Sequence, residues 1–479
     1  MPAADLTTAP DPTPDPTTLG ELRNGGHVHK PVKVELRDNL LARLAAGEAT
    51  FPGILGFDDT VLPEVERALL AGHDLVLLGE RGQGKTRLVR TFVGLLDAWT
   101  PVVAGCEIND HPYAPVCVRC ARLVAAQGDE TPVAWKHRSE RYGEKLATPD
   151  TSVGDLIGDV DPIKVVKAKE GRTLGDPETI HYGLVPRTNR GIFSVNELPD
   201  LAERIQVALL NVLEERDIQV RGYTLRLPLD LLVVASANPE DYTNRGRIIT
   251  PLKDRFGAEV RTHYPLRLED ELSVIRQEAV LDWPGTPVQV PDHLMEVIAR
   301  FTRLVRDSPQ VDQRSGVSAR FAVAATETVA ASAVRRAAVT GEPVAVARVC
   351  DLPSVVPASR GKVEFEAAEE GRELEVLAHL LRKATADTFR ARLGGLDLSG
   401  LQGRFAQGAT VETGDLVPAV DLLKGLGPVP GLAALLTRLG VEQESPGLAA
   451  AALEFALEGL HLNRRLAKDS VSGRTVYGG

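Results

Sequence analysis

Eight consecutive residues, GERGQGKT, have the pattern G-x-x-x-x-G-K-[ST], which binds the phosphate groups of nucleotides. They follow an apolar stretch, 75–78, and open a helical pattern, which is the context that the motif requires. The glycines allow backbone N–H groups to surround phosphate oxygens, and the helix N-terminus adds partial positive charge. Lys85 would reach the β- and γ-phosphates, and Thr86 would bind Mg²⁺. The predicted nucleotide contacts are Gly79, Glu80, Arg81, Gly82, Gln83, Gly84, Lys85 and Thr86.

A polar pair, Asn196 and Glu197, ends a second apolar stretch, 192–195. In Mg-nucleotide sites an acid at a neighbouring strand end holds Mg²⁺, usually through water, and a glutamate activates the attacking water. The amide of Asn196 can accept a hydrogen bond from a metal-bound water, but it lacks charge, so we expect weaker metal binding. Glu197 keeps the base position. The pair therefore predicts ATP hydrolysis that is slow but real.

Three further residues extend this candidate catalytic set. Asn238 follows an apolar strand and would hydrogen-bond the γ-phosphate or the attacking water, although an asparagine before proline is also common in turns. Arg255, in PLKDRFG, and Arg320, in SARF, are cations that could offset charge on the transferred phosphoryl group. Arginines are abundant on surfaces, so neither stands out in isolation.

These residues need a scaffold that brings several strand ends together. Strands alternating with helices imply a parallel α/β sheet. The expected strands are 75–78, a short strand within 100–110, 192–195, and 231–241, which ends in polar residues. The expected helices are 61–72 and 201–216, and 217–228 has the pattern of a hairpin.

The chain divides into five segments by composition. The first, 1–20, is rich in Pro, Thr and Asp and predicts a disordered tail. A partly helical segment, 21–50, precedes the α/β core, 51–267, which carries a long polar insertion at about 121–190. Apolar spacing then becomes helical over 268–350, and 351–479 is a helical, leucine-rich region with Gly-Pro breaks.

The composition narrows the possible classes of function. The chain has 479 residues and a formal net charge of −11, which disfavours a general nucleic-acid binder. No stretch approaches the roughly 20 apolar residues of a membrane span, and the N-terminus has no signal-peptide pattern. We therefore expect a cytoplasmic protein.

Three cysteines lie close together in CEINDHPYAPVCVRC, and the last two have the C-x₂-C spacing of zinc ligands. Two histidines lie nearby, so four of five residues could form a structural zinc site that braces the polar insertion. The alternative is three reduced thiols in small packed environments. The candidate zinc ligands are Cys106, His111, Cys117, Cys120 and His137.

Taken in order along the chain, these motifs resemble the AAA+ ATPases of the branch that holds the magnesium-chelatase ATPase subunit and the MoxR-type ATPases. The resemblance covers about residues 50–345, including LIGDVDPIKVVKAKEG, YGLVPRTNRGIFSVNELPDL and PLKDRFGAEV. It implies an AAA+ P-loop parallel sheet with flanking helices, then an α-helical lid over 268–350 and an α-helical C-terminal region.

The resemblance also implies roles for individual residues. Lys85 and Thr86 correspond to Walker A, the pair 196–197 to Walker B, and Asn238 to sensor 1. Arg255 corresponds to an arginine finger that reaches a neighbouring subunit, and Arg320 to sensor 2. Members of the branch form rings, usually hexamers, and the implied partner carries a von Willebrand A domain. Asn196 departs from the family's usual aspartate.

Four hypotheses of function follow. The first is a ring-forming Mg-ATP-dependent ATPase that remodels or chaperones a partner protein. The second is the magnesium-chelatase ATPase subunit of tetrapyrrole synthesis. The third is a transcription activator or DNA motor, which the acidic charge and the absence of a GAFTGA sequence disfavour. The fourth is a slow or non-hydrolysing scaffold that ATP binding alone controls.

Overall fold

The computed structural model describes residues 13–160, 180–214, 218–220, 223–225, 227–239, 247–313, 315–441, 445–471 and 474–478. The chain forms two compact units, and the boundary between them in the sequence lies between His263 and Tyr264. Among the described helices, none combines the length and apolar character that crossing a membrane requires.

The first unit is built on a five-stranded sheet of order β11-β1-β10-β7-β4. Every pair of neighbouring strands in this sheet is parallel. The strands are β1 (Leu75–Leu78), β4 (Tyr142–Leu146), β7 (Gly191–Asn196), β10 (Leu231–Ala237) and β11 (Ala258–Arg261). The helices are α1 (Leu19–Asn24), α2 (Val32–Ala46), α3 (Val61–Leu70), α4 (Lys85–Thr91), α5 (Val118–Gln127), α6 (Val153–Leu156), α8 (Leu184–Arg187), α9 (Glu203–Glu214) and α11 (Thr250–Arg255).

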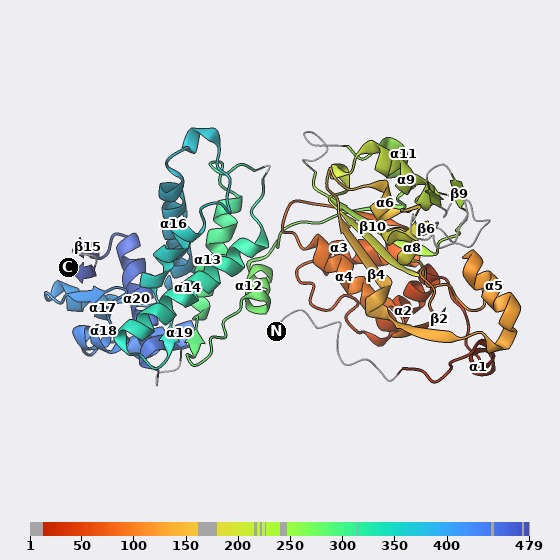
Figure 1. Cartoon of the computed structure of the whole chain (residues 1–479). Helices are drawn as coiled ribbons and strands as arrows, with labels where there is room; N and C mark the ends of the chain where they lie inside the picture. The colour runs from red at the N-terminus through yellow and green to blue at the C-terminus, as the bar shows by residue number, and fades with distance from the viewer. Residues whose placement is uncertain are drawn as a thin grey trace. The chain divides into compact units, whose positions relative to one another are not determined.

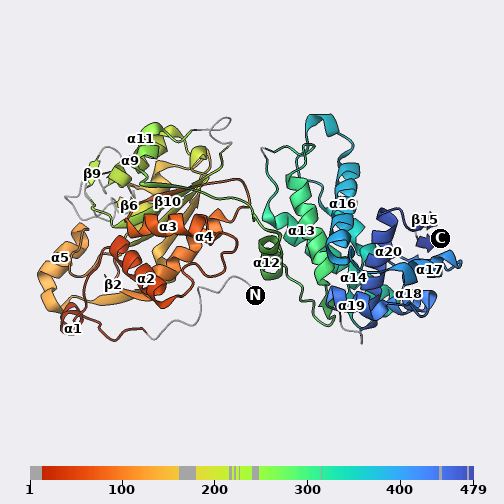
Figure 2. The ribbon, with the colours of Figure 1, turned by 180° about the vertical axis from the view of Figure 1, so that it is seen from behind.

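Helices cover both faces of this sheet, as Figures 1 and 2 show. Successive side chains of a strand point to opposite faces. Leu75 and Leu77 accordingly pack in the cluster formed with α2, α3 and α4, whereas Val76 and Leu78 pack in the cluster formed with α9 and α11. Burial on both faces explains why the central strands are continuous apolar runs. The predicted parallel α/β core is confirmed.

Two parts of this unit differ from the sequence-based expectation. The strand expected within 100–110 is β2 (Trp99–Val103), which pairs antiparallel with β3 (Val133–His137) outside the main sheet. The edge strand β4 lies in the stretch that was expected to be a polar insertion. Two short antiparallel pairs, β5 (Gly158–Val160) with β6 (Ile180–Tyr182) and β8 (Ile218–Val220) with β9 (Tyr223–Leu225), complete the unit. The second of these is the predicted hairpin.

The prediction of a disordered tail over 1–20 is wrong for its last residues, which are ordered. Residues 1–12 lie outside the described part of the chain. Beyond them, Thr17 accepts a hydrogen bond from the backbone of Val133, and Trp135 donates one to the carbonyl of Pro16 at 2.7 Å. The side chain of Leu19 is fully buried. Backbone pairing with β3 and this buried leucine therefore order the segment that begins at residue 13.

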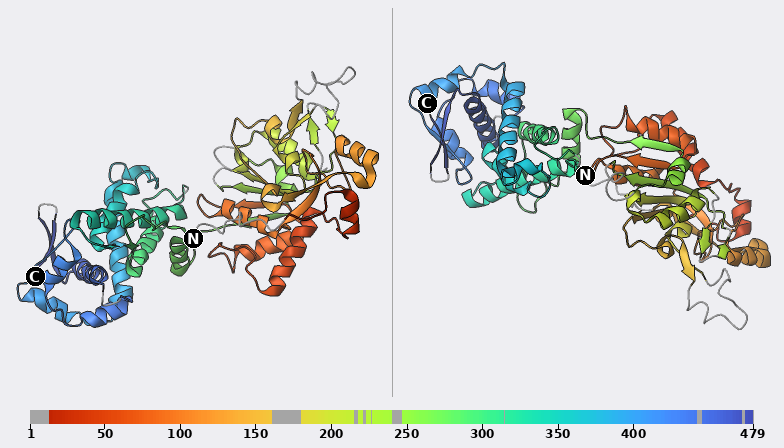
Figure 3. Two further views of the ribbon diagram at one scale, coloured as in Figure 1. Left: turned by 60° about the horizontal axis from the view of Figure 1, so that its bottom comes forward. Right: turned by 90° about the horizontal axis from the view of Figure 1, so that it is seen from above.

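The second unit is mostly helical. Its longer helices are α12 (Leu268–Glu278), α13 (Asp292–Arg306), α14 (Ala319–Thr340), α16 (Glu373–Leu393) and α20 (Pro446–Leu462). The shorter ones are α15 (Val355–Ala358), α17 (Ser399–Ala406), α18 (Ala419–Leu426) and α19 (Leu432–Leu439). Two small sheets accompany them, β12 (Val288–Gln289) with β13 (Ala345–Val346), and β14 (Val411–Thr413) with β16 (Arg474–Gly478) and β15 (Ala467–Val471). Figure 3 shows β15 and β16 as the ribbons near the C-terminus.

One hydrophobic core runs through the second unit, from Leu272 to Tyr477. The sequence analysis divides this part of the chain at residue 350, and a buried ion pair links the two segments. The guanidinium of Arg348 lies 3.2 Å from the carboxylate of Glu454 in α20. The same carboxylate accepts the backbone N–H of Cys350 at 2.9 Å. The residues on either side of 350 therefore pack as one body.

Candidate nucleotide site

The predicted phosphate loop connects β1 to α4. Gly84, the residue before α4, has φ 79°, a left-handed value that favours glycine. A Cβ at Gly79 would collide with the hydroxyl of Thr262 and the side chain of Gln83, which hydrogen-bond to each other at 2.8 Å. Gly84 is therefore favoured by its backbone conformation, and Gly79 by the close approach of two side chains.

Three predicted site residues meet at the carboxyl ends of neighbouring parallel strands. The ammonium of Lys85 donates to the amide oxygen of Asn238 at 2.9 Å and to the carbonyl oxygens of Gly79 and Glu80. The amide nitrogen of Asn238 in turn donates to the carboxylate of Glu197 at 2.8 Å. Ligands of open α/β sheets bind at this edge. The structure thus joins the loop lysine to the predicted base through one asparagine.

Glu197 is held in an uncommon backbone conformation. Its φ of 56° and ψ of 49° are left-handed, a region that a non-glycine residue adopts at a cost of about 1–3 kcal/mol. Its backbone N–H donates to the hydroxyl of Ser236 at 3.4 Å, and that hydroxyl donates to the side-chain oxygen of Asn196 at 3.3 Å. Strain of this kind is concentrated at functional sites. The turn aims the side chain of Glu197 at Asn238.

A carboxylate that sequence reasoning missed lies beside Asn196. The amide nitrogen of Asn196 donates to Glu144 of β4 at 2.6 Å. The guanidinium of Arg90 in α4 forms two hydrogen bonds with the same carboxylate, at 2.9 and 3.1 Å. Partial burial works to raise the pKa of Glu144, but the hydrogen bonds, led by that from Arg90, outweigh it and leave the pKa below its usual range. Glu144 is thus ionised next to the position where a carboxylate was expected.

The remaining predicted residues occupy separate places. Thr86 is the second residue of α4 and is half-buried. Arg255 is the last residue of α11 and forms a 2.7 Å ion pair with Glu214. Arg320 belongs to the second unit, where it is exposed in the first turn of α14.

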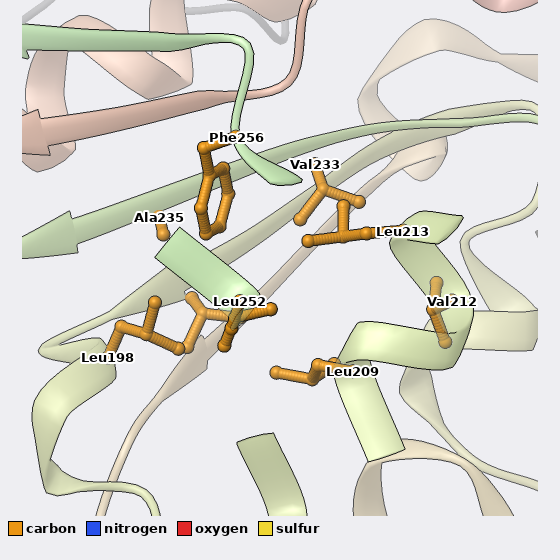
Figure 4. A pocket seen from close by; sticks show the side chains of 9 residues that line it. Leu198, Leu209, Val212, Leu213, Val233, Ala235, Leu252 and Phe256 are labelled. Carbon is orange, nitrogen blue, oxygen red and sulfur yellow. The ribbon is translucent and has the colours of Figure 1, made fainter. Parts of the chain in front are cut away.

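An apolar cluster fixes the position of Arg255. Leu252 of α11 and Phe256, the residue after Arg255, point into a small apolar pocket between α9, α11 and the sheet, which Figure 4 shows. Leu209 and Leu213 of α9 line its opposite side. Because the residues around Arg255 are anchored while its own side chain is exposed, the guanidinium is presented at the surface of the unit.

The predicted zinc ligands are brought together only in part. The sulfur atoms of Cys106, Cys117 and Cys120 form a group with a carboxylate oxygen of Asp110, all within 4.8 Å of one another. Neither predicted histidine belongs to this group, and Asp110 takes the fourth place. A β-bridge between residues 111 and 114 directs the imidazole of His111 towards His27, with 3.3 Å between the two Nε2 atoms. The ring of His137 packs against Trp99, and its Nδ1 pairs with Ser139.

Comparison with known proteins gives matches to parts of the chain. Residues 170–255 match the family described as the sigma-54 interaction domain. The acetoin dehydrogenase operon transcriptional activator AcoR of Bacillus subtilis (strain 168) is 25% identical over 175 residues, which cover 31% of this chain. The matched part of the chain spans 28% of that activator's length.

Two solved structures are also similar. A complex between the magnesium chelatase subunits BchI and BchD shows 22% identity, 68% coverage of this chain, 98% coverage of that chain and a TM-score of 0.35. NtrX from Brucella abortus in complex with ATP shows 14% identity, 77% coverage of this chain, 71% coverage of that chain and a TM-score of 0.39. At these TM-scores neither likeness bears on function. The strand order, the phosphate loop after β1 and the polar ends of β7 and β10 define an AAA+ P-loop fold, with a helical unit after it.

Proposed function

We propose that this chain is a Mg-ATP-dependent AAA+ ATPase of the MoxR and magnesium-chelatase type, which forms a closed ring and remodels a partner protein. One observation carries the proposal: Lys85, Asn238 and Glu197 form a continuous hydrogen-bonded set at the edge where a nucleotide would lie. Lys85 would exchange its loop carbonyls for phosphate oxygens. Asn238 would then orient the attacking water, and Glu197 would accept its proton.

Mg²⁺ would be held by the hydroxyl of Thr86 and, through water, by the strand end at Asn196. Glu144 supports this assignment because it places a negative charge 2.6 Å from the amide of Asn196. The guanidinium of Arg90 offsets part of this charge, and the remainder would attract a cation at about 4 Å. The pair of Asn196 and Glu144 would replace a single aspartate in function.

Ring assembly is part of the proposal, and the exposed guanidinium of Arg255 supports it, since this group would act as the finger for a neighbouring subunit. A finger in trans requires a head-to-tail contact that closes by rotation, and six subunits are the number that the resemblance implies. Arg320 would serve as sensor 2 from the second unit. The proposed partner carries a von Willebrand A domain, and the proposed location is the cytoplasm.

The first test of nucleotide binding is the change Lys85→Ala. Losing one charged hydrogen-bond donor to phosphate should weaken ATP binding by about 10- to 100-fold. Equilibrium titration with a fluorescent ATP analogue would measure the dissociation constant. Lys30→Ala, at an exposed lysine paired with Asp38, is the control and should bind as the wild type does. Equal affinity in both variants, with unchanged far-UV circular dichroism, would contradict the proposed site.

The role of Glu144 can be tested through the Mg²⁺ requirement. Glu144→Gln should raise the Mg²⁺ concentration for half-maximal ATP hydrolysis by about five- to tenfold, because it removes the only charge of the Asn196–Glu144 pair. Adding Asn196→Asp to that variant should return this Mg²⁺ concentration to the wild-type value. Glu130→Gln, on the exposed surface, is the control. An unchanged Mg²⁺ requirement in all three variants would place this pair away from the metal.

A sigma-54-dependent transcriptional activator is a second candidate, favoured by the match over residues 170–255 and by the similarity to AcoR. The absence of a GAFTGA sequence weighs against it. Capture of partners by ATP-trapped Glu197→Gln protein separates the two: sigma-54 would support the activator, and a von Willebrand A protein would support the remodelling ATPase. Magnesium-chelatase subunits would instead support a role in tetrapyrrole synthesis.

A further inference from the structure

Three cysteines and one aspartate converge between β2 and α5, apart from the nucleotide site. One oxygen of Asp110 and the sulfurs of Cys106, Cys117 and Cys120 lie within 4.8 Å of one another. In a tetrahedral site with zinc–sulfur distances of about 2.3 Å, the sulfur atoms are about 3.8 Å apart. The four ligand atoms are therefore already close to the spacing that one ion imposes.

The carboxylate of Asp110 is incompletely satisfied by the protein. Its side chain is fully buried, and one oxygen accepts the backbone N–H of Cys117 at 2.8 Å. The other oxygen is buried without a hydrogen-bond partner. Leaving such a group unpaired is costly, and a buried charge is normally paired or bound to a metal. A cation among the sulfur atoms would satisfy that oxygen.

Several groups around the sulfur atoms would stabilise them as thiolates once a cation is bound. Cys117 is the N-cap of α5, and its sulfur accepts the backbone N–H of Cys120 at 3.3 Å. The sulfur of Cys106 accepts the backbone N–H of Asp110, also at 3.3 Å. The guanidinium of Arg119 lies 3.8 Å from the sulfur of Cys120. Backbone N–H groups, a helix N-terminus and a nearby cation all stabilise negative sulfur, which is the form that binds metal.

We propose that Cys106, Asp110, Cys117 and Cys120 bind one structural zinc ion. Three soft thiolates select zinc rather than Mg²⁺ or Ca²⁺, and four protein ligands leave no open coordination position for catalysis. The C-x₂-C pair alone would also fit a redox dithiol. The third sulfur and the buried carboxylate distinguish the two, because a single disulfide would use neither.

The zinc ion would brace the residues that lead into β7. Asn109, next to Asp110, donates to the carbonyl oxygen of Arg187 at 2.6 Å. The guanidinium of Arg190 donates to the carbonyl of Pro101 in β2 at 2.7 Å, and Gly191 then begins β7. These contacts connect the cysteine cluster to the strand that ends at Asn196. Loss of the ion should therefore lower the thermal stability of this unit.

The test is the zinc content of the full chain purified without chelators, measured by mass spectrometry of the metal. We expect about one zinc per chain in the wild type. Cys117→Ser and Asp110→Asn should each lose it, whereas Cys350→Ser, at a half-buried cysteine in the other unit, should retain it. If the double variant Cys117→Ser/Cys120→Ser retained all of its zinc, the proposed site would be wrong.

Because a variant that lacks a ligand could fail to fold, metal binding is also measured on the wild type. Zinc is removed with a chelator and replaced by Co²⁺, and the absorbance of thiolate-to-cobalt charge transfer is recorded. We expect this absorbance together with a higher melting temperature than that of the metal-free chain. A wild type that holds neither metal, or a disulfide between Cys117 and Cys120 in the native chain, would overturn the proposal.

Discussion

Replacing Glu197 with glutamine should lower the rate of ATP hydrolysis by about 10²- to 10⁴-fold while leaving ATP bound. The amide oxygen of glutamine can still accept the hydrogen bond from Asn238, so the geometry is retained. What is lost is the ability to accept a proton from the attacking water. Steady-state phosphate release at saturating Mg-ATP measures the rate, and equilibrium titration confirms that affinity changes by no more than a few-fold.

A matched control separates this effect from a general loss of charge. Glu203→Gln alters an exposed glutamate at the start of α9, six residues further along the chain, and should hydrolyse ATP at the wild-type rate. If Glu197→Gln also keeps the wild-type rate, Glu197 is not the base. If the wild type and both variants bind ATP but show only background hydrolysis, the nucleotide-controlled scaffold replaces the ATPase.

Replacing Arg255 with alanine should lower hydrolysis by about 10³-fold if its guanidinium completes a neighbour's site. Within its own chain this residue makes exposed contacts with Glu214 and Asp254, and exposed ion pairs contribute little to folding. The variant should therefore remain folded. Phosphate release measures the loss, and Arg37→Ala, at an exposed arginine of α2, is the control that should keep full activity.

Mixing two inactive variants tests whether the finger acts between subunits. A chain carrying Arg255→Ala keeps Glu197, and a chain carrying Glu197→Gln keeps Arg255. In a mixed ring, some interfaces combine the intact half of each, so activity should return well above that of either variant alone. A mixture as inactive as its components, under conditions in which the subunits exchange, would contradict a finger in trans.

The parts of the fold that the sequence predicted best are those with unambiguous apolar signals. The buried strands 75–78, 192–195 and 231–237 are continuous hydrophobic runs because helices cover both faces of the sheet. The edge strand β4, YGEKL, has no such signal, since it is short and half polar. Its place in the sheet comes from pairing with β7, a long-range contact that local periodicity does not record.

The candidate site shows the same division. The loop residues and Glu197 follow from motif spacing, and the structure brings Lys85, Asn238 and Glu197 into direct contact. Glu144 was missed because it approaches Asn196 only across neighbouring strands. Asp110 was not among the predicted ligands because a lone aspartate has no distinctive spacing, and the usual partners of a C-x₂-C pair are cysteine and histidine. In both cases packing, rather than spacing along the chain, brings the carboxylate oxygen to the proposed site.

The fate of bound ATP tests the central claim most directly, since the claim is that this site turns over Mg-ATP although Asn196 replaces a carboxylate. The full chain is saturated with ATP and Mg²⁺, freed of excess nucleotide and quenched after increasing times, and the bound nucleotide is separated and quantified. The account predicts that ADP accumulates in the wild type while ATP persists in Glu197→Gln. ATP that stays intact for equally long in both proteins would contradict it.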